Sequence, residues 1–305
     1  MAITEAIRQE RKKYIGASDI SALFGCSPWA TAYDLWAEKT GRMPDEDKFT
    51  NDAMLAGNMF EDGVIQEAAS RIGEIDTDPD RMFLKDQDRK LCANMDGILL
   101  STKCPVEAKT AGFQGPPPDY WFDAGEVCIP DHVICQVQQQ IMLMGADHGY
   151  VAAFITSGHG FHLWPVDADP DMHTAIETLS AEFWDHVKTD TPPDATPSIE
   201  TVQKIHRVQG STCDISMASV ELWDQYRQDR LAAEKLEKAA KADMLKLLGD
   251  CEVGFLPDGS RLEFNEVTRK AFQAKAFQQD YPELYVQYMG SSPYRKVYWK
   301  GRPKG

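Results

Sequence analysis

The sequence predicts a mixed α/β (α+β) fold, in which a central mixed sheet is flanked by helices and followed by a long helix and a small α+β appendage. Short stretches of alternating apolar and polar residues, typical of half-buried strands, are interleaved with longer stretches in which apolar residues recur every three or four positions, as on a helix face. A proline-rich stretch, residues 189–198, interrupts this pattern. We therefore expect a folded core over residues 1–190, a linker over 191–215 and a C-terminal region over 216–305.

The bulk composition is that of an ordinary folded protein. The 305 residues are 43% hydrophobic and 26% charged, values typical of globular domains. No apolar run is long enough to span a membrane. The seven cysteines form no Cys-x-x-Cys pair, which predicts a cytosolic protein with reduced thiols and argues against an iron–sulfur cluster.

The charge balance limits how this chain could bind a nucleic acid. Its net charge of −16 is unfavourable for a polyanionic partner unless the basic residues are concentrated locally. Two concentrations exist, one near each end: Arg8, Arg11, Lys12, Lys13, and then Arg295, Lys296, Lys300, Arg302, Lys304. A solvated tail accounts equally well for the second group.

Four predicted helices precede the predicted sheet. The first 41 residues predict helices over 2–13, from the N-cap Ser18, and over 31–39. In the next helix, residues 51–72, one face is formed by Gly57, Glu61, Ile65, Ala68 and Ile72. Glu61 thus lies on an apolar stripe, where a carboxylate is costly to bury unless it is paired or binds a metal. The alternative is that Glu61 ends the stripe at the solvent edge, where the helix dipole favours negative charge.

Three polar side chains converge on the strands that follow. Because side chains alternate along a strand, Glu107 and Lys109 point to the same face, opposite Val106. Asp96 begins a preceding strand that is expected to pair with this one through a turn at residues 101–103. Two carboxylates and a lysine would then meet at one end of the sheet.

This set of side chains suits metal-dependent phosphodiester hydrolysis. Hard oxygen ligands hold Mg²⁺, which lowers the pKa of a bound water, and a nearby lysine can orient or deprotonate that water. Glu-x-Lys is also a common string, so a solvated ion pair on an exposed strand face is the alternative for this motif taken alone.

The rest of the predicted core contains one helix, a hairpin and a closing helix. The apolar stripe of the helix over residues 132–144 consists of Val133, Val137, Ile141 and Met144. Gln136 and Gln140 lie on a neighbouring face, which solvent could equally well cover. Residues 150–156 and 160–166 predict a hairpin that completes the sheet, and an amphipathic helix over 171–188 closes it.

The C-terminal region predicts a few well-separated elements. They are a long helix over 216–248, a hairpin over 252–267, a short helix over 272–279 and a strand over 294–299. The long helix has few apolar residues in its second half, so it is expected to be a half-exposed arm or strut. The sequence leaves open whether this region binds DNA, a partner protein or another copy of the chain.

Several motifs occur in an order that resembles a known family. They are GNMFE at 57–61, MDG at 95–97, VEAK at 106–109 and QVQ at 136–138, preceded by IGASDISALFGCSPW at 15–29 and LWAEKTGR at 35–42. Together they resemble the PD-(D/E)xK nucleases, and among these the phage lambda exonuclease type, the YqaJ-like viral recombinases. The resemblance covers residues 8–190. One departure is Met95, which stands where a proline often precedes the aspartate.

The resemblance implies a restriction-endonuclease-like core and a set of site residues. Glu61, Asp96 and Glu107, with the backbone carbonyl of Ala108, would bind Mg²⁺, or Mn²⁺ as a substitute. Lys109 would position the attacking water, and Gln136 matches the family's active-site glutamine. Arg11 and Ser18 match residues that hold the 5′ phosphate of a DNA end. A helix N-terminus beside an arginine is an anion site, although Ser18 could equally be an ordinary cap.

The activity implied by the resemblance is 5′-to-3′ exonuclease action on double-stranded DNA ends, generating 3′ overhangs for phage-type recombination in a bacterial host cell. A ring-shaped trimer and a single-strand annealing protein are the implied partners. An endonuclease of the same fold, a non-catalytic DNA-binding protein and an RNA substrate stay open.

Three tryptophans could stack on bases of such a substrate. Trp29 and Trp36 belong to the N-terminal segment, and Trp121 follows a Gly-Pro-rich loop over residues 111–120 that is expected to border Lys109. Because tryptophans pack in protein cores more often than they stack on nucleic acid, packing is the interpretation that we favour for all three.

Overall fold

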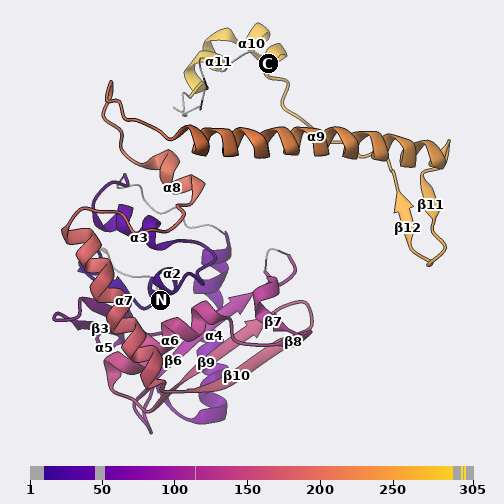
Figure 1. Cartoon of the computed structure of the whole chain (residues 1–305). Helices are drawn as coiled ribbons and strands as arrows, with labels where there is room; N and C mark the ends of the chain where they lie inside the picture. Colours follow the sequence, from indigo (N-terminus) through magenta and orange to yellow (C-terminus); the bar gives the residue numbers. More distant parts are fainter. Residues whose placement is uncertain (1–9, 45–51, 114, 291–296, 298, 300–305) are drawn as a thin grey trace. The chain divides into compact units, whose positions relative to one another are not determined.

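The computed structural model describes residues 10–44, 52–113, 115–290, 297 and 299, and the chain forms two compact units, residues 1–207 and 208–305 (Figure 1). The boundary between the units falls inside the predicted linker. Most of the helix predicted over residues 2–13, the strand predicted over 294–299 and the basic residues of the C-terminal end lie outside the described residues. No described helix has the length and apolar character that crossing a bilayer requires.

The first unit is built on the mixed sheet that the sequence predicts. Its strands are β2 (Ile75–Asp76), β5 (Gly97–Leu99), β6 (Cys104–Ala111), β9 (His148–Ile155) and β10 (Gly160–Asp167). Their order is β10-β9-β6-β5-β2, with β6 parallel to β9 and antiparallel to β5. The predicted hairpin after Asp96 is confirmed, since Gly97 pairs with Val106.

Two helices cover opposite faces of this sheet. Val64 and Ala68 of α4 (Asp52–Ile72) pack with Ala152 of β9. On the other face, α6 (Asp131–Met144) packs against Val151 of β9 through its predicted stripe, Val133, Val137 and Ile141. Each buried valine or isoleucine among these contributes roughly 1.5–3 kcal/mol to the free energy of folding. Because β6 pairs in register with β9, Glu107 and Lys109 face α6, whereas Ala108 faces α4.

A second, three-stranded sheet is attached to α6 by a buried glutamine. It consists of β1 (Ile15–Gly16), β4 (Leu91–Asn94) and β3 (Phe83–Asp86), in the order β1-β4-β3. Gln139 donates hydrogen bonds through Nε2 to the carbonyl oxygens of Ile15 at 3.0 Å and Cys92 at 2.9 Å. Its neighbour Gln138 donates to the carbonyl oxygen of Asp167, at the end of β10, at 2.8 Å. Helix α6 is thereby fixed against both sheets.

The remaining elements of the first unit are short, apart from α7. They are α2 (Ile20–Leu23), α3 (Ala32–Lys39), α5 (Pro79–Met82), η1 (Asp119–Trp121), β7 (Phe122–Asp123), β8 (Glu126–Val127), α7 (Pro170–Lys188) and α8 (Ile199–Lys204). Helix α3 begins as predicted, because the Thr31 side chain and Asp34 form a capping box.

One local prediction was wrong. The N-cap of α2 is Asp19 and not Ser18, because the Ser18 hydroxyl accepts a hydrogen bond from Arg11 instead. The predicted linker contains α8, which is tied to the rest of the first unit because the Ser198 amide donates to Asp34 Oδ1 at 3.0 Å.

The second unit contains the predicted long helix and hairpin. Its elements are α9 (Met217–Leu248), β11 (Val253–Phe255), β12 (Arg261–Glu263), α10 (Ala274–Asp280) and α11 (Pro282–Tyr288), the last of which the sequence did not indicate. Helix α9 ends at Gly249 as expected. Apolar side chains along it, such as Leu222, Tyr226 and Leu236, are exposed, which agrees with the half-exposed arm that the sequence predicts.

Candidate active site

The centre of the site is a contact between β6 and α6. Alternation along β6 directs Glu107 and Lys109 toward α6, where Gln136 meets both. Lys109 Nζ donates to Glu107 Oε1 and, at 3.1 Å, to Gln136 Oε1, and Gln136 Nε2 donates to Glu107 Oε1 at 2.5 Å. The structure therefore brings together three of the residues that the sequence singles out.

Gln140 is a further contact of Glu107 to which sequence reasoning gave no role. Its Nε2 donates to Glu107 Oε2 at 2.6 Å, and the side chain is fully buried. One turn of α6 separates Gln140 from Gln136, so the two amides hold one carboxylate oxygen each. The sequence did contain a signal for Gln140: it follows Gln136 by four residues and so lies on the same face of the helix.

Asp96 lies beside Glu107 because the backbone of β6 holds it there. Its Oδ2 accepts a hydrogen bond from the Ala108 amide at 2.8 Å. Burial, the neighbouring charge of Glu107 and the charge of Glu61 raise the pKa of Asp96 well above its ordinary value, against the opposing effects of Lys109 and of the amide bond. Burial alone would lower the pKa of Lys109, but the charges of Glu107 and Asp96 raise it. The lysine is therefore held as a cation.

Glu61 lies on α4, which packs on the face of the sheet opposite α6. Its charge contributes to the raised pKa values of both Asp96 and Lys109. Within the described residues, no three His, Cys, Asp or Glu side chains are grouped closely enough to hold a metal ion as they stand. The donor chemistry nevertheless suits a hard cation, because burial and the charges of Glu107 and Glu61 destabilise the ionised form of Asp96, and a bound cation would offset that cost.

The proposed anion-binding residues face the same space as the carboxylates. Arg11 Nη2 donates to Ser18 Oγ at 2.9 Å. A cavity of about 170 Å³ is lined by Arg11, Gly16, Ala17, Ser18, Cys92, Asn94, Asp96, Glu107 and Gln136. Residues that are widely separated in the sequence thus share one cavity.

The position of Arg11 depends on a glycine and a buried lysine. A Cβ at Gly16 would lie 2.6 Å from Arg11 Nη2, so any larger residue here would displace the guanidinium. Lys39 Nζ donates to the Arg11 carbonyl oxygen at 3.2 Å and lies 4.0 Å from Asp19 Oδ2. The Arg11 guanidinium lies 4.0 Å from Asp19 Oδ2 and lines the cavity, where it could also meet an anion.

His132 lies one helical turn before Gln136 on α6 and is buried. Burial and, secondarily, the charge of Lys109 lower its pKa to about 4, with Asp131 acting in the opposite direction. The imidazole is therefore neutral near pH 7. On unfolding the ring regains its ordinary pKa, so the unfolded chain binds one more proton between about pH 4 and 6.5 than the folded chain does.

This shift predicts acid sensitivity of the folded state. The stabilisation is fully present above pH 6.5, and it is lost as the pH falls toward 4. Between pH 7.5 and 5.0 the His132 contribution amounts to about 2 kcal/mol. We expect the His132→Phe variant to lose that much less stability than the parent over this range, as measured by urea denaturation of both proteins at the two pH values. Parallel losses in the two proteins would contradict the prediction.

Comparison with known proteins gives the following similarities. Residues 8–147 match the model of the YqaJ-like viral recombinase domain. The chain is 25% identical over 298 residues to the uncharacterized protein YqaJ of Bacillus subtilis strain 168. The aligned region covers 94% of this chain and 91% of that protein.

Solved structures of similar shape include an alkaline exonuclease from Laribacter hongkongensis, with 15% identity, a TM-score of 0.47 and coverage of 61% of this chain and 94% of that one. A phage-related exonuclease from Haemophilus somnus 129PT matches with 11% identity, a TM-score of 0.39 and coverage of 58% and 96%.

Proposed function

We propose, from the match of residues 8–147 to the model of the YqaJ-like viral recombinase domain, that the chain is a Mg²⁺-dependent exonuclease that degrades double-stranded DNA from the 5′ end and leaves 3′ overhangs for recombination. The observation that carries the proposal is the cavity that Arg11 and Ser18 share with Asp96, Glu107 and Gln136. An anion site and a carboxylate cluster that open to one space suit a substrate with a terminal phosphate next to a scissile phosphodiester.

The carboxylates are the groups that would hold the metal. Asp96, Glu107 and Glu61, with the carbonyl oxygen of Ala108, supply the hard oxygen donors that Mg²⁺ prefers, and Mn²⁺ could substitute. When bound, the metal would polarise the phosphate and lower the pKa of a water. Burial and the charges of Glu107 and Glu61 make the ionised form of Asp96 unfavourable, so binding of a cation beside it would be favoured.

The side chains around the carboxylates have distinct roles in this proposal. Lys109, held as a cation between Glu107 and Gln136, would orient the attacking water and offset the charge that develops on the phosphate. Gln136 would fix the positions of both neighbours. Arg11 and Ser18 would bind the terminal 5′ phosphate and so align the first phosphodiester with Lys109.

Linear duplexes labelled at the 5′ or the 3′ end, incubated with Mg²⁺ or with EDTA, test the proposal directly. Release of the 5′ label as mononucleotide, only with Mg²⁺ and with closed circular DNA left intact, is the expected result. Cleavage of the circular DNA would indicate an endonuclease of the same fold and not an exonuclease. No Mg²⁺-dependent product from any DNA would leave a non-catalytic DNA-binding protein, and cleavage of RNA alone would change the substrate. The trimer and the annealing partner stay proposals from resemblance.

Removing Gln140 is expected to impair catalysis without removing any proposed metal ligand. In Gln140→Leu, Glu107 Oε2 loses its 2.6 Å donor, so the carboxylate is less firmly oriented. We expect a 10- to 100-fold weaker Mn²⁺ affinity, the range typical of groups that orient metal ligands, and a comparable loss of kcat. Gln140→Glu would add a fourth carboxylate, and the pH optimum would move with it.

Isothermal titration with Mn²⁺ measures the affinity separately from turnover. Gln203→Leu, a polar-to-apolar change on α8, is the matched control. Unchanged Mn²⁺ affinity and kcat in Gln140→Leu would contradict the role of Gln140.

A further inference from the structure

Three aromatic rings beside the active site are arranged edge to face. The Trp29 ring lies 4.8 Å from His132 at an interplanar angle of 85° and 6.4 Å from Tyr120 at 77°, and Tyr120 lies 5.1 Å from His132 at 90°. No ring of the three is stacked flat on another. Trp29 is 69% exposed, whereas Trp36 and Trp121 are each 3% exposed and belong to the core. The packing role that the sequence favours therefore holds for two of the three tryptophans.

A cavity of about 270 Å³ adjoins these rings. Tyr120 and His132 line it together with Pro28, Phe122, Ile129 and Pro130. Among the described residues that line this cavity there is no lysine or arginine, and Asp131 contributes a negative charge. A phosphate would be repelled here, whereas an uncharged, flat, partly apolar group would be accommodated.

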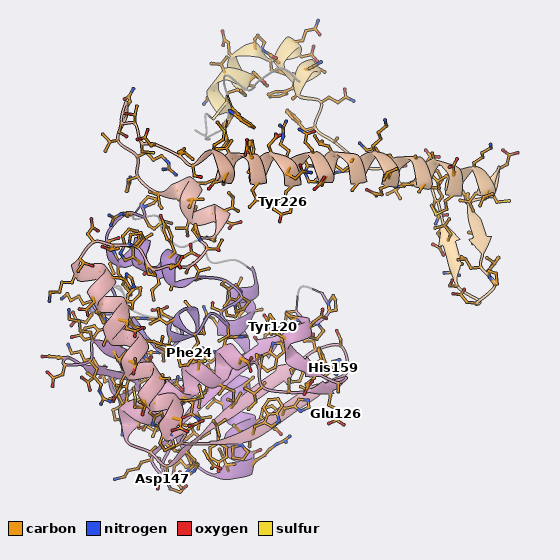
Figure 2. The ribbon with its side chains drawn as sticks, viewed as in Figure 1. Phe24, Tyr120, Glu126, Asp147, His159 and Tyr226 are labelled. Atoms are coloured by element: carbon orange, nitrogen blue, oxygen red, sulfur yellow. The ribbon has the colours of Figure 1, made fainter. Side chains whose placement is uncertain are left out.

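This cavity and the active-site cavity are lined by residues one turn apart on α6, His132 and Gln136. His132, Gln136 and Gln140 succeed one another at spacings of four, on one face of the helix, and the last two contact Glu107. His132 is thus about 6 Å along the helix axis from Gln136. Tyr120, labelled in Figure 2, and His159 lie at the end of the sheet toward which β6 and β9 run, and Asp147 lies at the other end. The three rings therefore lie near the C-terminal end of β6, where Lys109 is also located.

We propose that Trp29, Tyr120 and His132, with the adjoining cavity, bind an unpaired nucleobase of the DNA strand whose phosphate lies at Lys109. The inference rests on the proposed function for the identity of the strand. Aromatic rings with an open face bind nucleobases by stacking, whatever the DNA sequence. Because no lysine or arginine is among the described residues that line the cavity, the cavity suits the base better than the phosphate. The terminal nucleotides must leave the duplex to reach a carboxylate cluster inside a cavity, and this site would hold one of them by its base.

A double-mutant cycle between the ring and the base tests the proposal. Duplexes carry an abasic tetrahydrofuran residue at one of the three terminal positions of either strand, and their Kd is measured by fluorescence anisotropy. The protein is Lys109→Ala, so that binding is observed without cleavage. Trp29→Ala in this background is expected to weaken binding of the intact duplex by about 5- to 100-fold, as for the loss of one stacked base. At one position the abasic residue should abolish that difference.

Control variants separate stacking from other effects. Trp29→Phe keeps a ring and should retain most of the affinity, and Phe255→Ala removes an exposed ring from the second unit and should change nothing. Because Trp29 is largely exposed, its replacement is expected to leave the thermal midpoint within a few degrees of the parent, which melting curves would verify.

Each outcome decides the matter. An equal effect of Trp29→Ala on intact and abasic duplexes at every position would show that the ring does not contact a base, and it would overturn the proposal, as would an unchanged Kd for the intact duplex. Absence of DNA binding by the Lys109→Ala protein would overturn it as well. If the chain with Lys109 intact cleaves no DNA but the base-dependent difference persists, the proposed exonuclease function fails and the base-binding site stands.

Discussion

Replacing Lys109 by alanine is expected to lower the rate of DNA-end hydrolysis by about 10²- to 10⁴-fold, the range that a positioned acid–base or orienting group contributes. The ammonium contacts Glu107 and Gln136 at once, and its pKa is raised by Glu107 and Asp96, although burial opposes this. Without it the attacking water loses its orienting cation. Affinity for the metal should persist or increase, because the negative charge of the carboxylates is then no longer partly neutralised.

This combination distinguishes loss of catalysis from loss of the site. Single-turnover rates on 5′-labelled duplexes would be measured beside Mn²⁺ titration and DNA binding of the same protein. Lys188→Ala, which removes an exposed lysine at the end of α7, is the matched control. A Lys109→Ala protein with a rate within threefold of the parent would refute the assigned role, and so would one whose lost activity is fully explained by lost metal affinity.

Replacing Asp96 by alanine is expected to abolish both tight metal binding and cleavage. A loss of about 10³-fold in rate is anticipated if the metal is required for the chemistry. Asp96→Asn is the sharper variant, because its side-chain oxygen can still accept the hydrogen bond from the Ala108 amide. It removes the charge and keeps the shape.

The same variant should have the opposite effect on the metal-free fold. The pKa of Asp96 is raised by burial, by Glu107 and by Glu61, which means that its ionised form destabilises the folded state at neutral pH. Asp96→Asn should therefore melt at a higher temperature than the parent in EDTA, while Mn²⁺ should raise the melting temperature of the parent alone. A variant that is still stabilised by Mn²⁺ and still cleaves DNA would remove Asp96 from the metal site.

The sequence was informative wherever a short-range rule fixed the geometry. Because side chains alternate along a strand, the sequence placed Glu107 and Lys109 on one face of β6. The number of residues between Asp96 and Glu107 predicted a hairpin, and the pairing of Gly97 with Val106 confirms it. Gln136 was different, because a glutamine at the edge of an amphipathic face can meet either solvent or a partner. Only resemblance singled it out, and its contacts depend on how α6 crosses the sheet.

Features set by distant partners escaped prediction. Ser18 had the position of an N-cap, but Arg11, seven residues earlier, binds its hydroxyl and Asp19 begins the helix. Gln140 is buried against Glu107, on the face of the sheet that α6 covers, and nothing in the helix itself indicates this. The exposure of Trp29 likewise depends on where its loop lies, since the same residue type is buried at positions 36 and 121.

The run of three glutamines in α6 makes the length of that helix a strict requirement. Gln138 reaches the end of β10, Gln139 reaches the small sheet and Gln140 reaches Glu107. Deleting one residue upstream of them would rotate all three by about 100° about the helix axis, so every one of these partners would be lost in a single step. Substitutions in α6 can be absorbed one contact at a time, but insertions and deletions cannot, so natural variation in chain length should be confined to the loops on either side of it.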